Sequence, residues 1–314
     1  MKTKLTFSLL AAAAACSVAN AQTTAYTTPV GYYNYDAKAG GNLLVPALVE
    51  ASAFAGAITA RSSNTITVSS GAITANAFDA ANGYATHYVE ITQAGSNQGV
   101  VIDIASNTNS VITLASDASA LNLAGTESIV IRPHVTLSDC FTSAEAALAA
   151  YGDSATFYNP DGTSNTYYFI GAGDWSSDLA TPDGNDRPIP PGSGIIFDCG
   201  ADAALTIVGE VKTTDTVVQI YGSGVANIVG PVNPLVGDSA LIKDLGFADM
   251  VAYGDSISLY APGQYNAPTG TYYSLGDGTV SVDLANPSDN TFSFTTGGIF
   301  TAGVDTAFKV KSGL

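Results

Sequence analysis

The sequence predicts a mainly-β protein, in which a small β-barrel or sandwich domain is inserted in, or precedes, a duplicated β-module that carries one or two short helices. Three observations predict this fold. Apolar and polar residues alternate in short segments rich in β-branched side chains, which is the pattern of a half-buried strand. Such segments recur roughly every ten residues between turns rich in Gly, Asn, Ser and Asp, as in small barrels and sandwiches. A long stretch of the chain is also repeated.

The composition limits the classes of function. The chain has 314 residues, of which 46% are hydrophobic and 12% charged, and its formal net charge is -17. This apolar content is too high for an intrinsically disordered chain. A nucleic-acid-binding protein needs clustered cations to displace counterions from phosphates, whereas the 10 Lys and Arg residues are scattered. We therefore expect no nucleic-acid partner.

Residues 1–21 have the features of a secretory signal peptide. Two lysines precede an apolar stretch, and the small residues Ala19 and Ala21 end it, as signal peptidase requires. Cleavage before Gln22 would change the formal net charge from -17 to -19, and we expect the product in the periplasm, at the cell surface or in the medium. A lipoprotein anchored through Cys16 is the alternative, but the leucine usual three positions earlier is absent. No later segment has the roughly 18 consecutive apolar residues of a spanning helix, so no membrane span is predicted.

Residues 22–137 are predicted to form an N-terminal β-domain, with a barrel-like insert at about 53–137. Strands are predicted in the insert at residues 65–68, 87–92, 100–104, 110–114 and 128–132. Glu90 and Asp103 occupy polar positions on two of these strands. Because side chains alternate between the two faces of a strand, we expect both carboxylates to face outward.

An internal repeat organises the rest of the chain. Tyr151-Gly-Asp-Ser154 recurs after 102 residues as Tyr253-Gly-Asp-Ser256, and Thr166-Tyr-Tyr168 recurs after 105 residues as Thr271-Tyr-Tyr273. Ordered identities with a single small insertion indicate a duplicated module, since two copies are too few for an open solenoid.

A fainter echo links Asn42-Leu-Leu-Val-Pro46 with Asn227-Ile-Val-Gly-Pro231. The predicted order is therefore a lead strand, the inserted domain, the first copy, a second lead strand and the second copy. We assign the first copy to residues 138–212, and the second lead strand with the second copy to residues 213–314.

One helix is predicted at residues 143–150, where Thr142 or Ser143 would cap its N-terminus and Gly152 would end it. A weaker helical turn is predicted near residues 239–245.

Two cysteines, Cys140 and Cys199, follow the signal segment. An even pair in an oxidising compartment favours one disulfide. The alternative is a pair of buried free thiols.

Gly-Asp-Ser occurs three times, beginning at Gly152, Gly237 and Gly254. In Gly-Asp-Ser-Leu hydrolases the serine attacks an ester, and a histidine later in the chain acts as the base. His87 and His134 precede all three serines, and leucine follows none of the motifs. We therefore predict turns in which Asp and Ser bond to nearby backbone amides. Without metal-ligand spacing, both histidines are predicted to be structural rather than Zn²⁺ ligands.

Most acidic residues lie in loops, and no carboxylate pair is singled out as a glycosidase site. The loop Asp183-Gly-Asn-Asp186 clusters oxygen atoms of the kind that Ca²⁺ prefers. Asp183 and Asp186 are therefore candidate Ca²⁺ ligands, although the loop lacks the spacing of an EF-hand. The alternative is a solvated turn without any cofactor.

Aromatic residues could stack on sugar rings, and the candidates are Tyr167, Tyr168, Trp175, Tyr272 and Tyr273. The alternative is that each adjacent tyrosine pair places one ring in the core and the other at the surface of a strand.

Several segments resemble a known family. They are Thr28-Pro-Val-Gly-Tyr-Tyr33, the strand at Tyr88, Ile131-Arg-Pro-His-Val-Thr-Leu137 and the repeated Thr-Tyr-Tyr, together with Pro190-Pro-Gly-Ser-Gly-Ile-Ile196. The chain resembles an uncharacterised family of secreted β-rich proteins found mainly in verrucomicrobial and planctomycetal bacteria. The second copy departs from the pattern, with Thr301-Ala-Gly303 in place of Pro-Pro-Gly. The resemblance implies export and architecture, and no activity, cofactor or site residues.

These patterns together predict an exported, non-enzymatic structural protein of the cell surface or extracellular matrix. Its expected partners are further copies of itself or other surface proteins. A carbohydrate-binding protein that uses exposed Tyr and Trp side chains is the alternative, and a secreted hydrolase is a remote one.

Overall fold

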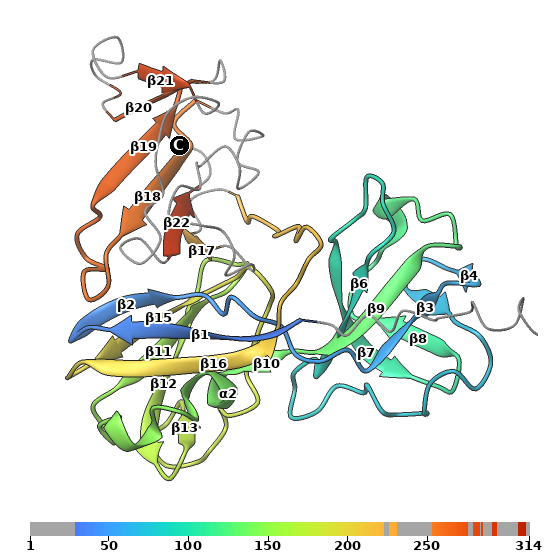
Figure 1. Cartoon of the computed structure of the whole chain (residues 1–314), viewed down its shortest axis with the longest axis horizontal. Helices are drawn as coiled ribbons and strands as arrows, with labels where there is room; N and C mark the ends of the chain where they lie inside the picture. The colour runs from blue at the N-terminus through green and yellow to red at the C-terminus, as the bar shows by residue number, and fades with distance from the viewer. Residues whose placement is uncertain are drawn as a thin grey trace, which may run out of the picture.

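Strands dominate the computed structural model, which confirms the mainly-β prediction (Figure 1). The structure describes residues 29–222, 226–230, 253–275, 279–282, 284, 291–293 and 307–311. Within these residues, no helix has the length and apolar character needed to cross a membrane. The weaker helical turn predicted near residues 239–245 lies outside the described residues.

The first module is built on a five-stranded antiparallel sheet with the order β13-β12-β11-β15-β2. Its strands are β2 (Gly40–Leu44), β11 (Ser154–Tyr158), β12 (Ser164–Gly171), β13 (Asp174–Ser176) and β15 (Ile195–Cys199). A two-stranded ribbon of β1 (Val30–Ala37) and β16 (Ala203–Glu210) belongs to the same module. Alternate side chains of the ribbon, including Tyr35, Leu205 and Ile207, share a buried core with the sheet residues Phe157 and Phe197.

Helix α2 (Leu137–Phe141) also packs into this core, through Leu137, Cys140 and Phe141. It begins at a capping box in which Thr136 and Asp139 satisfy each other's backbone amides, a strong start signal. The helix predicted at residues 143–150 is therefore wrong in position. Only a 3₁₀ turn, η2 (Glu145–Ala147), forms there. The alanine-rich segment buries little apart from Ala144, and a short helix without a packed apolar face is not stable.

The inserted domain is a curled seven-stranded sheet with the order β3-β9-β6-β7-β8-β5-β4, and it stands beside the first module (Figure 1). Its strands are β3 (Phe54–Ala57), β4 (Ala60–Arg61), β5 (Thr65–Thr67), β6 (His87–Ile91), β7 (Val101–Asn107), β8 (Val111–Leu114) and β9 (Ser128–Pro133). The 3₁₀ turn η1 (Ser119–Leu121) lies between β8 and β9. One face of the sheet forms a separate core that includes Val89, Ile104, Ile112 and Ile131. A short pair, β10 (Val135–Thr136) with β14 (Pro188–Ile189), follows this domain.

The second module is built on a six-stranded sheet with the order β17-β22-β18-β19-β20-β21. Its strands are β17 (Ala226–Val229), β18 (Ser256–Tyr260), β19 (Gly270–Ser274), β20 (Thr279–Ser281), β21 (Thr291–Ser293) and β22 (Ala307–Lys311). Strands β17, β22, β18, β19 and β20 follow the same order as β2, β15, β11, β12 and β13.

The register also agrees between the two sheets. Ser154 pairs with Tyr168 in the first sheet, and Ser256 pairs with Tyr273 in the second. A hydroxyl pair crosses the same two strands in each, Thr156 with Thr166 at 2.8 Å and Ser258 with Thr271 at 2.9 Å.

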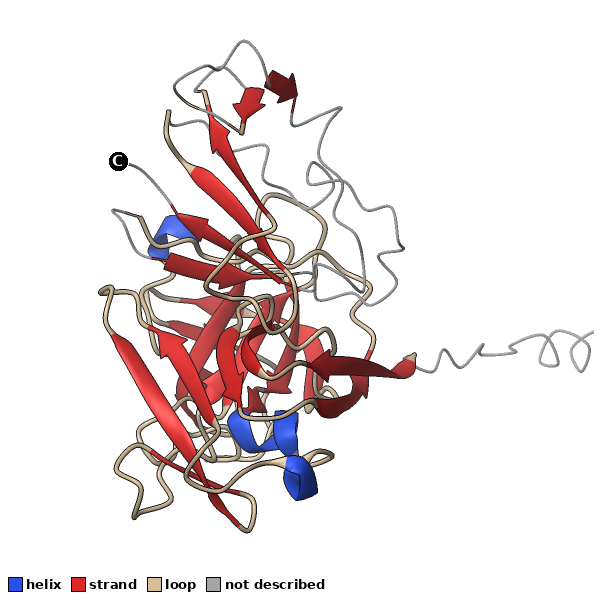
Figure 2. Ribbon diagram, turned by 90° about the vertical axis from the view of Figure 1, so that its left-hand side faces the viewer, coloured by secondary structure: helices blue, strands red, loops and turns tan. Residues whose placement is uncertain are grey.

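The six-stranded sheet lies above the five-stranded sheet of the first module in Figure 1, and Figure 2 shows how strands make up most of the described chain in the turned view. The two sheets contact each other through corresponding residues. The contact is an apolar cluster of Leu43, Val45, Ile196 and Ile228, joined by Tyr158, Tyr260 and Tyr265. Main-chain bonds reinforce it, because Gly194 N donates to Ile228 O at 2.9 Å and Gly230 N donates to Gly192 O at 3.1 Å.

Candidate functional site

A group of paired ionisable side chains lies where the inserted domain meets the first module. Tyr88 on β6 is paired across the sheet with Arg132 on β9 and with Asp103 on β7. Glu90 lies two residues beyond Tyr88, and His134 lies two residues beyond Arg132. These side chains occupy the face opposite the apolar core, because Val89, Ile91 and Ile131 fill that core.

The segment that leaves β16 covers this polar face. Lys212 Nζ lies 2.9 Å from Glu90 Oε1, and Thr214 Oγ1 donates to the same oxygen at 2.7 Å. Arg132 pairs with the carboxylate of Glu210, donates to Glu50 O at 2.6 Å, and lies 3.7 Å from Glu90 Oε2 through its Nε. Glu90 is only 1% exposed and Lys212 only 3%. Glu90 does point away from the apolar core of its own sheet, as predicted. It is nevertheless buried, because the segment with Lys212 and Thr214 covers that face.

Burial shapes the electrostatics of this junction. Desolvation lowers the pKa of Lys212, and the charge of Glu90 acts against that shift. Desolvation also raises the pKa of Glu50 and of Tyr88. Two carboxylates, Glu90 and Glu210, balance the two cations. Each of these four charged groups thus has an oppositely charged partner, and the contacts connect the inserted domain with the segment that leaves β16.

A His–Asp pair borders the network. His134 Nε2 lies 3.0 Å from Asp103 Oδ1, and the ring of His134 contacts Tyr88 at 4.9 Å between centroids. Four buried side-chain atoms in the described residues have no hydrogen-bond partner, and three of them lie here: Tyr88 Oη, Arg132 Nε and His134 Nδ1. Asp103 keeps the outward orientation predicted for it, with 45% of its side chain exposed.

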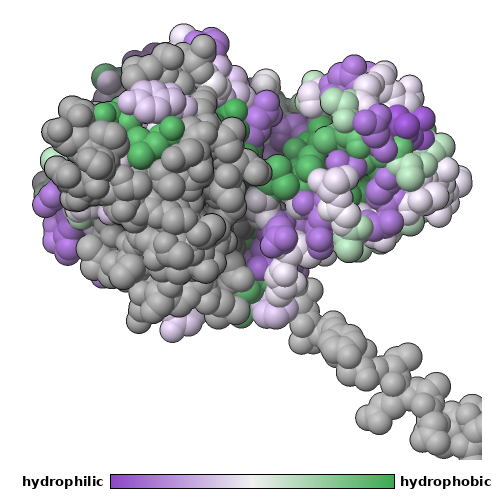
Figure 3. Space-filling view, turned by 90° about the horizontal axis from the view of Figure 1, so that it is seen from above, coloured by the Kyte–Doolittle hydropathy of each residue, from purple (hydrophilic) through white to green (hydrophobic). Residues whose placement is uncertain are grey.

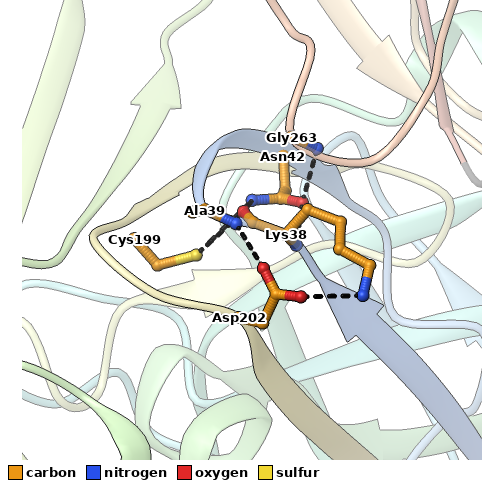
Figure 4. A network of polar contacts seen from close by, with 6 residues as sticks. All are labelled: Lys38, Ala39, Asn42, Cys199, Asp202 and Gly263. Carbon is orange, nitrogen blue, oxygen red and sulfur yellow. Dashed lines mark hydrogen bonds and ion pairs between the residues drawn. The ribbon is translucent and has the colours of Figure 1, made fainter.

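A second polar centre, at Asn42, joins the two modules (Figure 4). Asn42 Nδ2 donates to Lys38 O and to Gly40 O, each at 2.8 Å. Asn42 Oδ1 accepts from Lys38 N at 2.9 Å and from Gly263 N of the second module at 2.8 Å. A side chain at residue 263 would collide with Lys38, because a Cβ there would lie 2.7 Å from Lys38 Cβ. Glycine at this position is therefore required for the close approach.

Asn227, the residue that echoes Asn42 in the sequence, makes the same kind of contact. Its amide accepts from Tyr221 N at 2.8 Å and donates to Tyr221 O at 2.9 Å. Each lead strand therefore uses one asparagine to close the loop that precedes it.

The Gly-Asp-Ser motifs that the structure describes form turns. Asp153 is buried, and its carboxylate accepts from Ala149 N at 2.8 Å and from Gly200 N at 2.9 Å. His87 bonds to Thr86 and His134 to Asp103, so neither is hydrogen-bonded to Ser154 or Ser256. The motif that begins at Gly237 lies outside the described residues.

The two candidate Ca²⁺ ligands have different protein partners. Asp183 accepts from Ser177 N at 2.8 Å and from Ser177 Oγ at 2.5 Å, whereas Asp186 accepts from Asn82 Nδ2 at 2.7 Å. In the part of the chain that the structure describes, no three His, Cys, Asp or Glu side chains gather as a metal site.

The aromatic candidates for sugar stacking are largely buried. Trp175 is 1% exposed and lies against Phe141 and Phe169, so its ring is a core element and cannot stack on a ligand. Tyr167 is 4% exposed, and its hydroxyl is bonded to Tyr84 at 2.9 Å. The remaining three, Tyr168, Tyr272 and Tyr273, are half-buried. Among the residues that the structure describes, the exposed tyrosines are instead Tyr32, Tyr151 and Tyr253.

Comparison with known proteins identifies no relative. No protein-family model, no curated protein and no solved structure matches the chain. The resemblance to a secreted β-rich family therefore stays a prediction.

The sequence reasoning missed Lys212 and the exposed Tyr151. The sequence offers one weak signal for Lys212. It is one of only 10 cations and directly follows a segment of alternating residues, where a pairing with a carboxylate is plausible. The motif Tyr151-Gly-Asp-Ser154 indicates a turn, but it contains no signal that the Tyr151 side chain is 65% exposed.

The structure does not contain the predicted disulfide. Cys140 and Cys199 are both free and buried, which is the alternative given for them. Cys140 lies in α2, whereas Cys199 Sγ donates to Lys38 O at 3.2 Å. Each sulfur is thus held in its own surroundings.

Thiol titration of the protein without residues 1–21 is expected to give two reactive thiols per chain in denaturant and none in the native state. Burial raises the pKa of Cys199 to about 11 and raises that of Cys140 as well, so little thiolate forms at neutral pH. The measurement is a colorimetric thiol assay on protein purified without reductant. Zero thiols in denaturant would instead establish the disulfide.

Proposed function

We propose that the protein is an exported structural protein of the cell surface or extracellular matrix, and that it acts by binding rather than by catalysis. The observation that carries this proposal is how the ionisable groups are used. Glu90, Glu210, Arg132 and Lys212 neutralise one another at a buried junction, and Asp153 bonds to backbone amides. Asn42 in turn joins the first module to Gly263 of the second module, so these polar groups serve to hold the β-units together.

The surface supports the same proposal. The outer face of the ribbon exposes Val30 by 72%, Tyr32 by 69% and Val208 by 62%, and Tyr32 lies directly opposite Val208. Figure 3 shows that the inserted domain mixes hydrophilic and hydrophobic areas on the face seen from above. Strand ribbons with exposed apolar side chains are suited to contacts with other molecules.

Fractionation of cells that express the whole chain tests this proposal. We expect the processed protein in the outer-surface or medium fraction, and we expect sedimentation of the purified protein to show assemblies that grow with concentration. The double variant Tyr32→Ser, Val208→Ser should fold as the wild type does, but it should form smaller assemblies at the same protein concentration. Protein that remains in the cytoplasm, or that stays strictly monomeric at all concentrations, would contradict the proposal.

A further inference from the structure

Two tyrosines project into solvent from corresponding turns of the repeat. Tyr151 is 65% exposed and Tyr253 is 60% exposed, and they are separated by the 102 residues of the repeat. Each begins a Tyr-Gly-Asp-Ser motif whose aspartate is buried, Asp153 in the first copy and Asp255 in the second. A large aromatic side chain is thus exposed at the same place twice.

Tyr151 has a backbone conformation that disfavours a side chain. Its φ is +63°, in the left-handed region that usually takes Gly or Asn. Gly152 N donates to Ala149 O at 3.0 Å, so Tyr151 occupies the third position of a tight turn, where a positive φ favours glycine. Folding alone therefore gives no reason for tyrosine here. Strained residues of this kind concentrate where a protein binds or reacts.

The turn that carries Tyr151 is fixed rather than loose. Tyr151 N donates to Phe169 O at 2.7 Å, and Phe169 N donates to Asp153 O at 3.0 Å. In the second copy Ser274, the counterpart of Phe169, accepts from Gly254 N at 2.9 Å and donates to Asp255 O at 2.7 Å. Both tyrosines are therefore presented by turns bonded to a strand, which lowers the entropy lost when a ligand binds.

Small residues surround the Tyr151 turn. Its chain neighbours are Ala149, Ala150 and Gly152, and a Cβ placed on Gly171 would lie 3.8 Å from Ala150 Cβ. Small neighbours leave room for a flat ligand beside the phenol ring.

We propose that Tyr151 and Tyr253 form a pair of stacking sites for a neutral polysaccharide. Sugar rings offer flat C–H faces to an aromatic ring, and a polymer of repeated units offers many such faces, so each exposed tyrosine can stack on one. The formal net charge of -17 opposes acidic polymers, and stacking on a phenol ring requires no charge on the sugar, so we specify a neutral chain. The proposal rests on the exported role above, since it names a partner found outside the cell.

Affinity electrophoresis in gels that contain cellulose derivatives, mannan, β-1,3-glucan or agarose tests the pair. We expect at least one neutral polymer to retard the wild-type protein. Tyr151→Ala and Tyr253→Ala should each bind about 3–10-fold more weakly, from loss of a stacked contact, and the double variant should lose binding. Leu179→Ala is the matched control, because Leu179 is also a large exposed side chain at a positive φ, with 45% exposure and a φ of +66°. It lies outside the two Tyr-Gly-Asp-Ser turns and should bind as wild type.

A glycine substitution separates binding from folding. Tyr151→Gly relieves the positive φ, so its melting temperature should equal or exceed that of wild type while its binding falls as in Tyr151→Ala. The proposal is overturned if no neutral polymer retards the wild type, if Leu179→Ala weakens binding as much as the turn variants, or if Tyr151→Gly binds normally. The experiment uses purified protein, so failure here leaves the result of the fractionation experiment standing.

Discussion

Replacement of Lys212 by methionine is expected to lower the free energy of unfolding by about 3–5 kcal/mol, because it leaves Glu90 buried without its cation. Lys212 Nζ lies 2.9 Å from Glu90 Oε1, in a site where both side chains are 2% exposed. Methionine preserves most of the aliphatic part of the side chain, so the decrease in the free energy of unfolding measures the loss of the ammonium group. Urea titration followed by circular dichroism measures it.

Lys38→Met is the matched control for that experiment. Lys38 pairs with Asp202 at the same distance, 2.9 Å, but the two side chains are 54% and 63% exposed. Exposed pairs are screened by water and salt and contribute little, so we expect no measurable change. A Glu90→Gln, Lys212→Met double variant should recover part of the stability, since it removes the unpaired charge. Equal losses for Lys38→Met and Lys212→Met would contradict the assignment of the network.

Replacement of Trp175 by alanine is expected to lower the free energy of unfolding by about 3–5 kcal/mol, as for other large aromatic residues in cores. The indole is 1% exposed and lies 4.8 Å from Phe141 and 5.5 Å from Phe169 between ring centroids. Its removal leaves a cavity between α2 and the five-stranded sheet. Urea titration gives the stability change, and tryptophan fluorescence is lost because Trp175 is the single Trp of the chain.

Tyr168→Ala serves as the control for Trp175. Tyr168 is half-buried on the neighbouring strand and faces Ser176 across the pair, so its truncation should have a clearly smaller effect on stability. If Trp175→Ala left stability unchanged but abolished binding to a polysaccharide, the indole would be a ligand platform after all. The core assignment would then be wrong.

Strand patterns and turns could be predicted because they depend on neighbouring residues. Alternation located β6 and β7, and the repeated Gly-Asp-Ser segments were correctly interpreted as turns at Asp153. For the adjacent tyrosines, period two predicts one ring inside and one at the surface. Tyr167 is buried and Tyr168 half-buried, as this predicts, whereas Tyr272 and Tyr273 are both half-buried. The helix was misplaced because an alanine-rich segment signals propensity, whereas the capping box at Thr136 decided where the helix begins.

The candidate sites were harder to predict, because they depend on contacts between distant residues. Glu90 was expected to face solvent, and the pattern of its strand contains no sign that Thr214, 124 positions later, bonds to it. The sequence shows that Cys140 and Cys199 exist, but it does not show how far apart the fold holds them. The exposure of Tyr151 and its positive φ are both properties of the folded turn, which the repeated motif alone does not reveal.

The amino-acid sequence by itself determined the mainly-β class, the order of the strands along the chain and the turns between them, because hydrophobic period and turn chemistry act over a few residues. The tertiary structure alone decided which polar groups are buried, which aromatic rings reach solvent, and that only glycine fits at residue 263. Burial is a property of what covers a residue, and the covering segments here come from other parts of the chain. The charge of Lys212 is visible in the sequence, but its use as the partner of Glu90 exists only in the fold.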